Sequence, residues 1–304
     1  MTDNLTHTLF SYFIGIIIIR LLKLDEKQKF PLIVAMVAGN LPDIDFVLRF
    51  FGALFYLSHH RVYTHSVLGI ILLAVALALI VKYVFKKKES FKYFLLALIA
   101  IIGHVFLDLI TSFGTEVFYP ISSARLAYSL IPIVDVYVLL IFFTGLWFMK
   151  IEKRSKVKVA KATLFIFFVF LIFKAGLHTL AKEQTEGLKD YQDVEVVPHF
   201  FNPFGWKAIV TKPDYYLMAD FDLTTGGFKG FEWYPILEKD KVEASKESVF
   251  VRQFLEFAKS PYPIVEGNKV TWIDLRVTEG KFTGMKAVVD LDENNILKKS
   301  EFGL

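Results

Sequence analysis

The sequence predicts a mainly α protein. We expect a polytopic helical membrane domain of about six spans, one of them short, followed by a small α+β domain outside the membrane. Long apolar runs recur through the first 180 residues, and short charged or polar connectors separate them. Hydrophobic residues make up 54% of the 304 positions, and 32 of them are phenylalanine. Beyond residue 181, short strand-like segments replace the apolar runs, so we expect domains at 1–181 and 182–304.

Charge divides the chain at the same place. Residues 1–180 hold 19 Lys and Arg against 10 Asp and Glu, whereas the remainder holds 16 against 21. The basic residues lie in short connectors rather than on one face, which argues against a nucleic-acid partner and leaves membrane lipids as the expected one. Cysteine is absent, so any metal site must use nitrogen and oxygen ligands.

The expected membrane spans are six apolar runs, at residues 5–22, 30–41, 67–85, 91–113, 133–149 and 162–180. The first has no basic segment before it and no small-residue cleavage site after it, so it predicts a retained helix rather than a signal peptide. The second is short, and by length alone it could be re-entrant.

The basic connectors predict the topology. Residues 20–29, 82–92 and 150–161 together hold 15 of the 19 basic residues in the first part. Short basic loops stay in the cytoplasm, and all three can do so only if the short second run crosses the membrane. The prediction is an integral protein of a bacterial- or archaeal-type cell membrane. Its amino terminus, its polar connector at 41–66 and its carboxy-terminal domain would be extracytoplasmic.

The carboxy-terminal part has the texture of strands. Segments at 206–211, 215–223, 228–234, 270–277 and 285–291 are short, aromatic and β-branched, and Gly, Pro, Asn or Asp bounds them. Apolar residues within 245–259 recur at helical spacing. We therefore expect a small antiparallel sheet with one helix.

Polar side chains gather in the connector at 41–66, which reads LPDIDFVLRFFGALFYLSHHRVYTHS. It holds Asp43, Asp45, His59, His60 and His65, and such carboxylates and imidazoles bind divalent metals where no thiol is present. The proline at position 42 favours an extended or turn backbone before it, so a helix should end there. The plain alternative is a polar connector, and His59 and His60 compete for one role.

A second polar cluster lies inside an apolar run. His104 and Asp108 are four residues apart and share one helix face, and ionisable groups deep in an apolar helix are costly and typical of functional sites. The alternative is a hydrogen-bonded pair that joins two helices. Asp135 could be a ligand or a helix-packing acid, and His7 a ligand or an interfacial imidazole.

The expected topology brings the candidate ligands to one side of the membrane. They are His7, Asp43, Asp45, His60, His65, His104, Asp108 and Asp135. Scattered polar residues would not gather in this way, so the clustering supports a site. The set exceeds one tetrahedral site and predicts one to three ions, or one metal with outer acids.

Other catalytic frames are missing from the sequence. It contains no Gly-rich phosphate loop, no G-x-S-x-G and no HExxH motif. Metal-activated water is therefore the simpler chemistry. Arg61 could hold a substrate phosphate or pair with a site carboxylate.

These residues also occur in the order of a known family. The matching segments are Thr6-His7, Leu41-Pro42-Asp43-Ile44-Asp45, His60-Arg61-x-x-Thr64-His65-Ser66 and His104-x-x-Leu107-Asp108. Together they resemble the YdjM-like membrane-bound metal-dependent hydrolases. Phe113-Gly114-Thr115 and the segment around Asp135 are similar to the longer YfhP-type members, which also carry a polar carboxy-terminal extension. The resemblance covers residues 1–180 well and the tail loosely.

The resemblance has consequences for single residues. Family members carry Asn or another residue where His59 stands, which indicates His60 as the ligand. Val62 replaces a glycine that often follows the arginine, a change that should not affect ligation. The family is itself similar to zinc-dependent phospholipase C and P1-type nucleases, helical enzymes that cut phosphate esters with His/Asp metal clusters. That similarity is what implies a phosphoester substrate.

The expected function is metal-dependent hydrolysis of a phosphoester in a lipid or envelope component, of the phosphoesterase or phospholipase C type. Zinc is the expected metal, with manganese or magnesium as alternatives. His60, His65, His104, Asp43, Asp45 and Asp108 would be ligands, and His7 and Asp135 would complete or orient the set. Asp45 and Arg61 are the expected catalytic residues. The alternative is a non-catalytic metal-binding membrane protein or a transporter.

Overall fold

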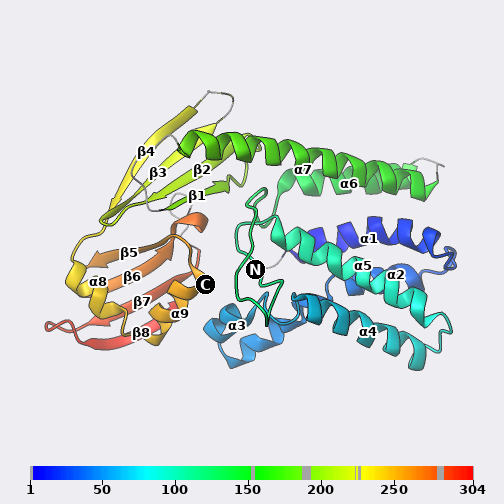
Figure 1. Ribbon diagram of the computed structural model, residues 1–304, viewed down its shortest axis with the longest axis horizontal. Coiled ribbons are helices and arrows are strands. Elements are labelled where there is room, and N and C mark those ends of the chain that lie inside the picture. The colour runs from blue at the N-terminus through cyan, green and yellow to red at the C-terminus, as the bar shows by residue number, and fades with distance from the viewer. Residues whose placement is uncertain are drawn as a thin grey trace. The chain divides into compact units, whose positions relative to one another are not determined.

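The computed structural model describes residues 3–151, 155–186, 193–222, 224, 227–278 and 284–303. Contacts divide the chain into two units. The first comprises Met1–Asp45, His60–Gly176 and Phe200–Pro203, and the second comprises Phe46–His59, Leu177–His199 and Phe204–Leu304. Both units are drawn in Figure 1, where the first is mainly helical and the second is built on β-sheets.

The helices follow the apolar runs of the sequence. They are α1 (Asn4–Leu21), α2 (Phe30–Ala38), α4 (Val67–Tyr83), α5 (Ser90–Leu109), α6 (Val136–Ile151) and α7 (Lys156–Glu186). Between α2 and α4 the chain forms the 3₁₀ helix η1 (Leu41–Phe51) and the short helix α3 (Ala53–His59). Helix α2 ends at Ala38, near the end predicted before Pro42, but Leu41 begins the 3₁₀ helix η1 instead of the expected extended or turn backbone. Helix α7 runs through residue 181 without a break.

By length and composition, three helices in the described part of the chain can cross a membrane: α1, α5 and the Lys156–Thr185 part of α7. Helices α2 and η1 meet at a bend of 49°. Together they are long and apolar enough to make a fourth crossing or a re-entrant loop. Helices α4 and α6 are apolar but have only 17 and 16 residues. The helical membrane part is confirmed, but the predicted count of six spans is not.

Two apolar cores hold the helical unit together. One joins α1, α2, α4 and α5 around buried residues such as Ala35 and Ile101. The other joins α1, α5, α6 and α7, and there the rings of Phe13, Phe142 and Phe167 pack face to face or tilted. Helix α1 thus contributes to both cores. It also approaches α2 closely, since a Cβ at Gly15 would lie 2.7 Å from the Cβ of Ala35.

The second unit contains two four-stranded antiparallel sheets. The first has the order β1 (Asp193–Pro198), β2 (Gly205–Thr211), β3 (Tyr215–Asp222) and β4 (Gly227–Pro235). The second has the order β5 (Pro261–Glu266), β6 (Lys269–Asp274), β7 (Lys286–Leu291) and β8 (Leu297–Gly303). Helices α8 (Lys239–Ser245) and α9 (Val249–Phe257) connect the sheets.

The predicted strands correspond to β2, β3, β4, β6 and β7, and the predicted helix contains α9. One position of the expected 215–223 strand, residue 223, lies outside the described residues. The prediction of a single sheet is wrong, since the strands form two sheets. Strands β1, β5 and β8 were not predicted. Strand β8 reads LKKSEFG, with no buried position, and its sequence lacks the apolar alternation that identifies a strand.

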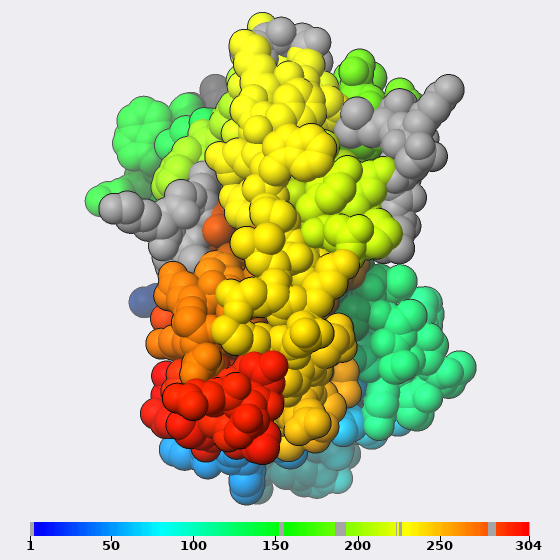
Figure 2. All heavy atoms as spheres, turned by 90° about the vertical axis from the view of Figure 1, so that its left-hand side faces the viewer, coloured from blue at the N-terminus to red at the C-terminus, as the bar shows by residue number. Residues whose placement is uncertain are grey.

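Apolar cores cover the sheets of the second unit, and β2 of the first sheet is buried on both faces, with Ile209 in one core and Trp206 in another. The ring of Phe254 on α9 packs on the second sheet with Val270, Trp272 and Val289. Trp206 and Phe221 of the first sheet pack against Leu177 and Ala181 at the end of α7. Strand β4 pairs only with β3, and most of its residues are exposed. Figure 2 shows β4 and the segment after it (yellow) along the surface in that view.

Substitution of Gly15 by alanine tests the close approach of α1 and α2. The added methyl group would overlap Ala35, and overpacking of this kind costs about 1–3 kcal/mol. We expect Gly15→Ala to lower the midpoint of thermal unfolding in detergent. The control is Gly176→Ala on α7, where a Cβ would meet no atom within 4 Å and alanine should stabilise the helix by roughly 0.5–1 kcal/mol. Equal midpoints for the two variants would contradict the packing.

Candidate metal centre

The polar residues singled out in the sequence meet within the helical unit. They come from four segments: the first turn of α1 (His7), the start of η1 (Asp43 and Asp45), the turn before α4 (His60, Arg61 and His65) and the last turns of α5 (His104 and Asp108). All eight side chains are buried, with exposed fractions of 8% or less. The helices bring them together because α1, α2 and α5 pack against one another.

Four of these residues direct one atom each toward a common point. His65 Nε2 lies 3.2 Å from His104 Nε2, 3.2 Å from Asp108 Oδ2 and 3.6 Å from Asp43 Oδ1. His104 Nε2 lies 3.5 Å from Asp43 Oδ1 and 3.4 Å from Asp108 Oδ2. We call Asp43, His65, His104 and Asp108 the tetrad.

A backbone carbonyl fixes the proton on His104. Its Nδ1 lies 2.8 Å from the carbonyl oxygen of Gly39, and because a carbonyl can only accept, Nδ1 must carry the hydrogen. In the neutral imidazole, which is the form that binds a metal, the Nε2 atom of His104 would then present a lone pair to the tetrad. Glycine is required at position 39, since a Cβ there would lie 1.7 Å from Ser11 Oγ on α1. This close approach brings the end of α2 within reach of His104.

A threonine hydroxyl fixes the proton on His65. Thr64 Oγ1 lies 3.2 Å from Asp45 Oδ2, and its single hydrogen must go to that carboxylate, which has none to give. The same oxygen therefore accepts from His65 Nδ1, at 2.9 Å. In the neutral imidazole, His65 Nε2 would then be the unprotonated nitrogen, and it faces the tetrad as His104 Nε2 does.

With both imidazoles neutral, the tetrad is a set of four electron-rich atoms. Among the described residues, neither oxygen of Asp43 has a hydrogen-bond partner, and neither does Asp108 Oδ2. Lone pairs and carboxylates in buried contact repel one another unless a cation lies among them. The donor set is two imidazole nitrogens and two carboxylate oxygens, which suits a divalent metal ion.

The spacing also indicates a coordination geometry. Ligand distances of about 2.0–2.2 Å in a tetrahedral zinc site place the ligand atoms roughly 3.3–3.6 Å apart. Adjacent ligands of an octahedral magnesium ion, at about 2.0–2.1 Å, would lie roughly 2.9 Å apart. Five of the six separations within the tetrad, from 3.2 to 3.6 Å, lie in the tetrahedral range. Asp43 shares a group within ligand reach with His65 and His104, whereas Asp108 shares one with His7 and His104.

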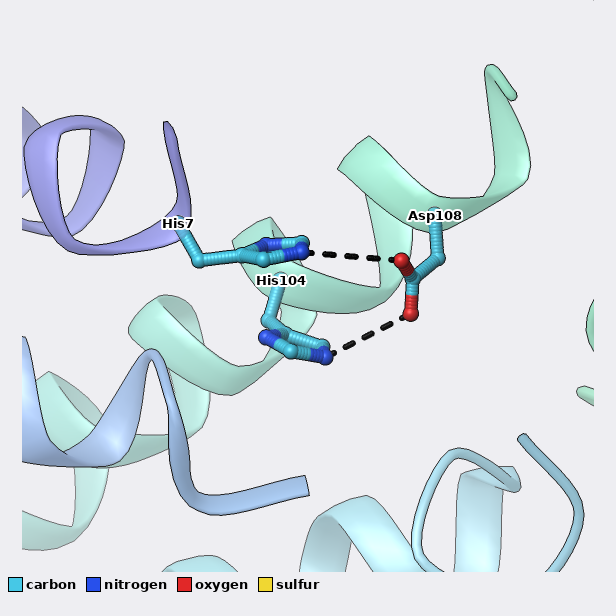
Figure 3. Close-up of side chains that lie close together, drawn as sticks. All are labelled: His7, His104 and Asp108. Atoms are coloured by element: carbon cyan, nitrogen blue, oxygen red, sulfur yellow. Dashed lines mark ion pairs between the residues drawn. The ribbon is translucent and has the colours of Figure 1, made fainter. Parts of the chain in front are cut away.

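His7 extends the cluster on the side of Asp108. Figure 3 shows the two oxygens of Asp108 divided between the histidines, with Oδ2 toward His104 and Oδ1 toward His7. The His7 ring stacks on that of His104, with centroids 3.9 Å apart, and its Nε2 is 3.6 Å from Asp108. His7, His104 and Asp108 therefore form a second group that could hold a metal ion, and it overlaps the tetrad.

Arg61 is placed against a site carboxylate, one of the two roles considered for it. Its guanidinium lies 2.6 Å from Asp108 Oδ1 and donates to Thr111 Oγ1 at 3.2 Å. The backbone of Arg61 is left-handed, with φ of 63°, a conformation that costs roughly 1–2 kcal/mol in a residue other than glycine. Asp45 Oδ2, which accepts the Arg61 N–H at 3.3 Å, helps to hold this backbone. A role for Arg61 in binding substrate stays a prediction.

Asp45 holds the turn that carries the histidines. Both of its oxygens lie 3.0 Å from His60 Nδ1, and it also accepts from Arg61 and Thr64. Burial lowers the pKa of the His60 imidazole, which favours the neutral form that can bind a metal. Asp43, Asp45 and His60 form a third overlapping group within ligand reach, so Asp45 and His60 stay predicted ligands. The catalytic role of Asp45 stays a prediction too.

Two other candidates have different surroundings. Asp135 Oδ1 accepts from the backbone N–H groups of Tyr137 and Val138, at 2.8 and 3.0 Å, and so caps the start of α6. Asp135 belongs to none of the three groups that the described residues form. The ring of His59 stacks on Phe55, and its Nδ1 lies 2.8 Å from the Phe55 carbonyl oxygen. This placement agrees with the choice of His60 over His59.

Sequence reasoning missed the groups that orient the ligands. The Gly39 carbonyl is a backbone atom and has no signature in the sequence. Thr111 follows Asp108 by three residues, a spacing that could have suggested it, because i and i+3 are neighbours on a helix. Thr64 was part of the recognised motif, but its link between Asp45 and His65 depends on the fold.

Comparison with known proteins identifies the family of this chain. Residues 1–178 match the family described as YdjM inner membrane protein, and residues 240–304 match the YfhP C-terminal alpha/beta plait domain. The chain is 22% identical over 296 residues to "Uncharacterized protein YfhP" of Bacillus subtilis (strain 168), a match that covers 92% of this chain and 87% of that protein. No solved structure matches. The first match spans more than half of the chain and includes the whole tetrad, so the protein belongs to the YdjM inner membrane protein family.

Proposed function

We propose that this protein is a membrane-bound metal-dependent hydrolase whose substrate is a phosphoester of a lipid or envelope component. The observation that carries the proposal is the convergence of four buried electron-rich atoms in the tetrad, at separations that suit one tetrahedral cation. The phosphoester substrate rests on the resemblance to zinc-dependent phospholipase C and P1-type nucleases.

The charge of the cluster supports a divalent ion. Its charged side chains are the carboxylates of Asp43, Asp45 and Asp108 and the guanidinium of Arg61. The two histidines of the tetrad are counted as neutral, because a metal binds the neutral imidazole. Together these side chains leave two uncompensated negative charges in a buried site, and a buried charge is stable only when it is paired or bound to a metal. A divalent cation would bring the sum to zero. Zinc fits the nitrogen and oxygen ligands and the spacing best.

The residues of the tetrad would hold the metal, which when bound lowers the pKa of water to near neutrality and polarises a phosphoryl oxygen. The surrounding residues orient those ligands. Gly39 and Thr64 keep the imidazole lone pairs directed inward, and mutation of such outer partners typically costs about 10–100-fold in metal affinity or activity. Arg61 holds Asp108 and adds positive charge beside the site, where it would stabilise negative charge that develops on a phosphate.

The orientation in the membrane is part of the proposal. The basic connectors at 20–29, 82–92 and 150–161 favour the cytoplasm. The metal centre and the carboxy-terminal unit would then face the extracytoplasmic side, where envelope phosphoesters occur.

One observation favours a second candidate function. Catalytic zinc sites usually have three protein ligands and an open position, whereas structural sites have four protein ligands. The tetrad supplies four, so a non-catalytic metal-binding membrane protein is the second candidate. In a hydrolase, the coordination would have to expand to five, or one carboxylate would have to withdraw.

The variant Asp43→Asn tests whether the tetrad binds a metal. We expect metal content, measured by mass spectrometry of the purified protein, to fall at least about tenfold, because an anionic ligand is lost. The metal-free variant should stay folded, since neither carboxylate oxygen of Asp43 has a hydrogen-bond partner among the described residues. His59→Ala is the matched control and should keep its metal. Full metal content in Asp43→Asn would show that Asp43 is not a metal ligand and would contradict a metal site at the tetrad.

Asp108→Asn should behave differently from Asp43→Asn. It removes the partner of the buried Arg61 guanidinium as well as a ligand, and breaking a buried ion pair costs about 3–5 kcal/mol. We expect metal loss together with a lower midpoint of thermal unfolding in the metal-free state. If both metal-free variants melted at the same temperature, the Arg61–Asp108 pair would not matter for stability.

Hydrolysis of simple phosphoesters separates the two candidate functions. The purified protein would be tested on p-nitrophenyl phosphate and bis(p-nitrophenyl) phosphate before and after chelation, and again after addition of zinc. We expect hydrolysis that chelation removes and zinc restores, and that is absent from Asp43→Asn. A protein that holds its full complement of metal and cleaves neither ester would contradict the hydrolase and favour the non-catalytic candidate.

A further inference from the structure

The helix that carries Asp43 and Asp45 has a second face with the opposite character. In a 3₁₀ helix, side chains three residues apart lie one above the other. On η1 this rule places Ile44, Val47 and Phe50 in one row, which we call the η1 ridge. Their exposed fractions are 52, 51 and 91%, whereas Asp43 and Asp45, the aspartates on either side of Ile44, are buried in the metal centre.

Further aromatic residues border the ridge. Phe46 and Phe51 are 56% and 74% exposed, so most of the apolar side chains of η1 lack protein cover. The guanidinium of Arg49 lies over the Phe46 ring, 5.3 Å from its centroid. Exposed phenylalanines at this density are typical of an interaction surface and not of a surface in water. An apolar face with an arginine beside it is the pattern of an interfacial helix, whose long basic side chain reaches the headgroups.

The continuity of η1 with α2 identifies what covers the ridge. Taken together, the two helices are long and apolar enough to span a membrane, with a bend of 49° between them. Helix α2 also leaves apolar side chains exposed, with Ile33 and Val37 each 48% exposed. The exposed apolar residues of α2 and those of η1 are separated only by the bend at Gly39 and Asn40. The simplest cover for both surfaces is the same apolar medium, the lipid bilayer.

We propose that η1 is a re-entrant element at the membrane surface, with Ile44, Val47 and Phe50 inserted among the lipid acyl chains. The buried Asp43 of the same helix would then hold the metal within one helical turn of the bilayer. A phosphoester headgroup could reach the centre while its apolar tail stays in the lipid. This consequence for the substrate rests on the proposed function, whereas the insertion of the ridge does not.

Spin labels can measure the depth of the ridge directly. The chain contains no cysteine, so Ile44→Cys, Val47→Cys and Phe50→Cys each give one labelling position. The labelled proteins would be reconstituted in vesicles of phosphatidylethanolamine and phosphatidylglycerol. Collisions of each nitroxide would be compared between oxygen, which concentrates in the acyl layer, and a nickel chelate, which stays in water. Asn294→Cys, in an exposed turn of the second unit, is the aqueous control.

We expect oxygen collisions to exceed nickel collisions at all three ridge positions, and the reverse at the control. The ridge side chains are more than half exposed, so the substitutions should not disturb packing, and an unchanged midpoint of thermal unfolding checks that each variant is folded. Nickel collisions as frequent as at Asn294→Cys would show that the ridge lies in water and would overturn the proposal. Low collision rates with both reagents would show that protein covers it, which overturns the proposal equally. Neither readout requires hydrolysis, so the outcome is independent of the proposed function.

Discussion

The repulsion between buried carboxylates and imidazole lone pairs is the constraint on which the helical unit depends. Asp43 and Asp108 lie against the Nε2 atoms of two buried histidines at separations of 3.2–3.6 Å, in a site that water does not reach freely. Without a cation such an arrangement is unfavourable, because each group would do better in water or with a hydrogen-bond donor. With a divalent ion the same arrangement becomes a coordination sphere. The buried His and Asp groups could therefore hold a metal ion.

The surrounding structure keeps the ligands in place. Hydrogen bonds to the Gly39 carbonyl and to Thr64 set the tautomers of the two histidines, and the Arg61 guanidinium pairs with the far oxygen of Asp108. Asp45 gathers three donors from the turn at residues 60–64 and helps to offset the cost of the left-handed backbone at Arg61. These contacts fix the ligand directions before any metal binds, which is what a tight and selective site requires.

Much of this could be predicted from the sequence because the signals are local. Apolar runs predicted the helices, and the spacing of four residues placed His104 and Asp108 on one face, where the structure has them. The sequence could not predict that Asp43 faces His65 and His104 while Asp45 faces His60, since this depends on how η1 meets α5 and the turn before α4. Asp135 looked like a site acid because it stands in an apolar run, but a lone carboxylate before a helix is as easily a cap, as found for α6. Strand β8 escaped prediction because its exposed residues carry no apolar alternation.

The central claim is that the tetrad is a four-ligand metal centre, and X-ray absorption at the zinc edge of the zinc-loaded protein tests it most directly. The account predicts one tightly bound zinc with four nitrogen or oxygen neighbours at about 2.0–2.1 Å, and the outer-shell scattering of two imidazoles. A six-oxygen shell without imidazole scattering, or a failure to take up zinc in stoichiometric amount, would contradict it.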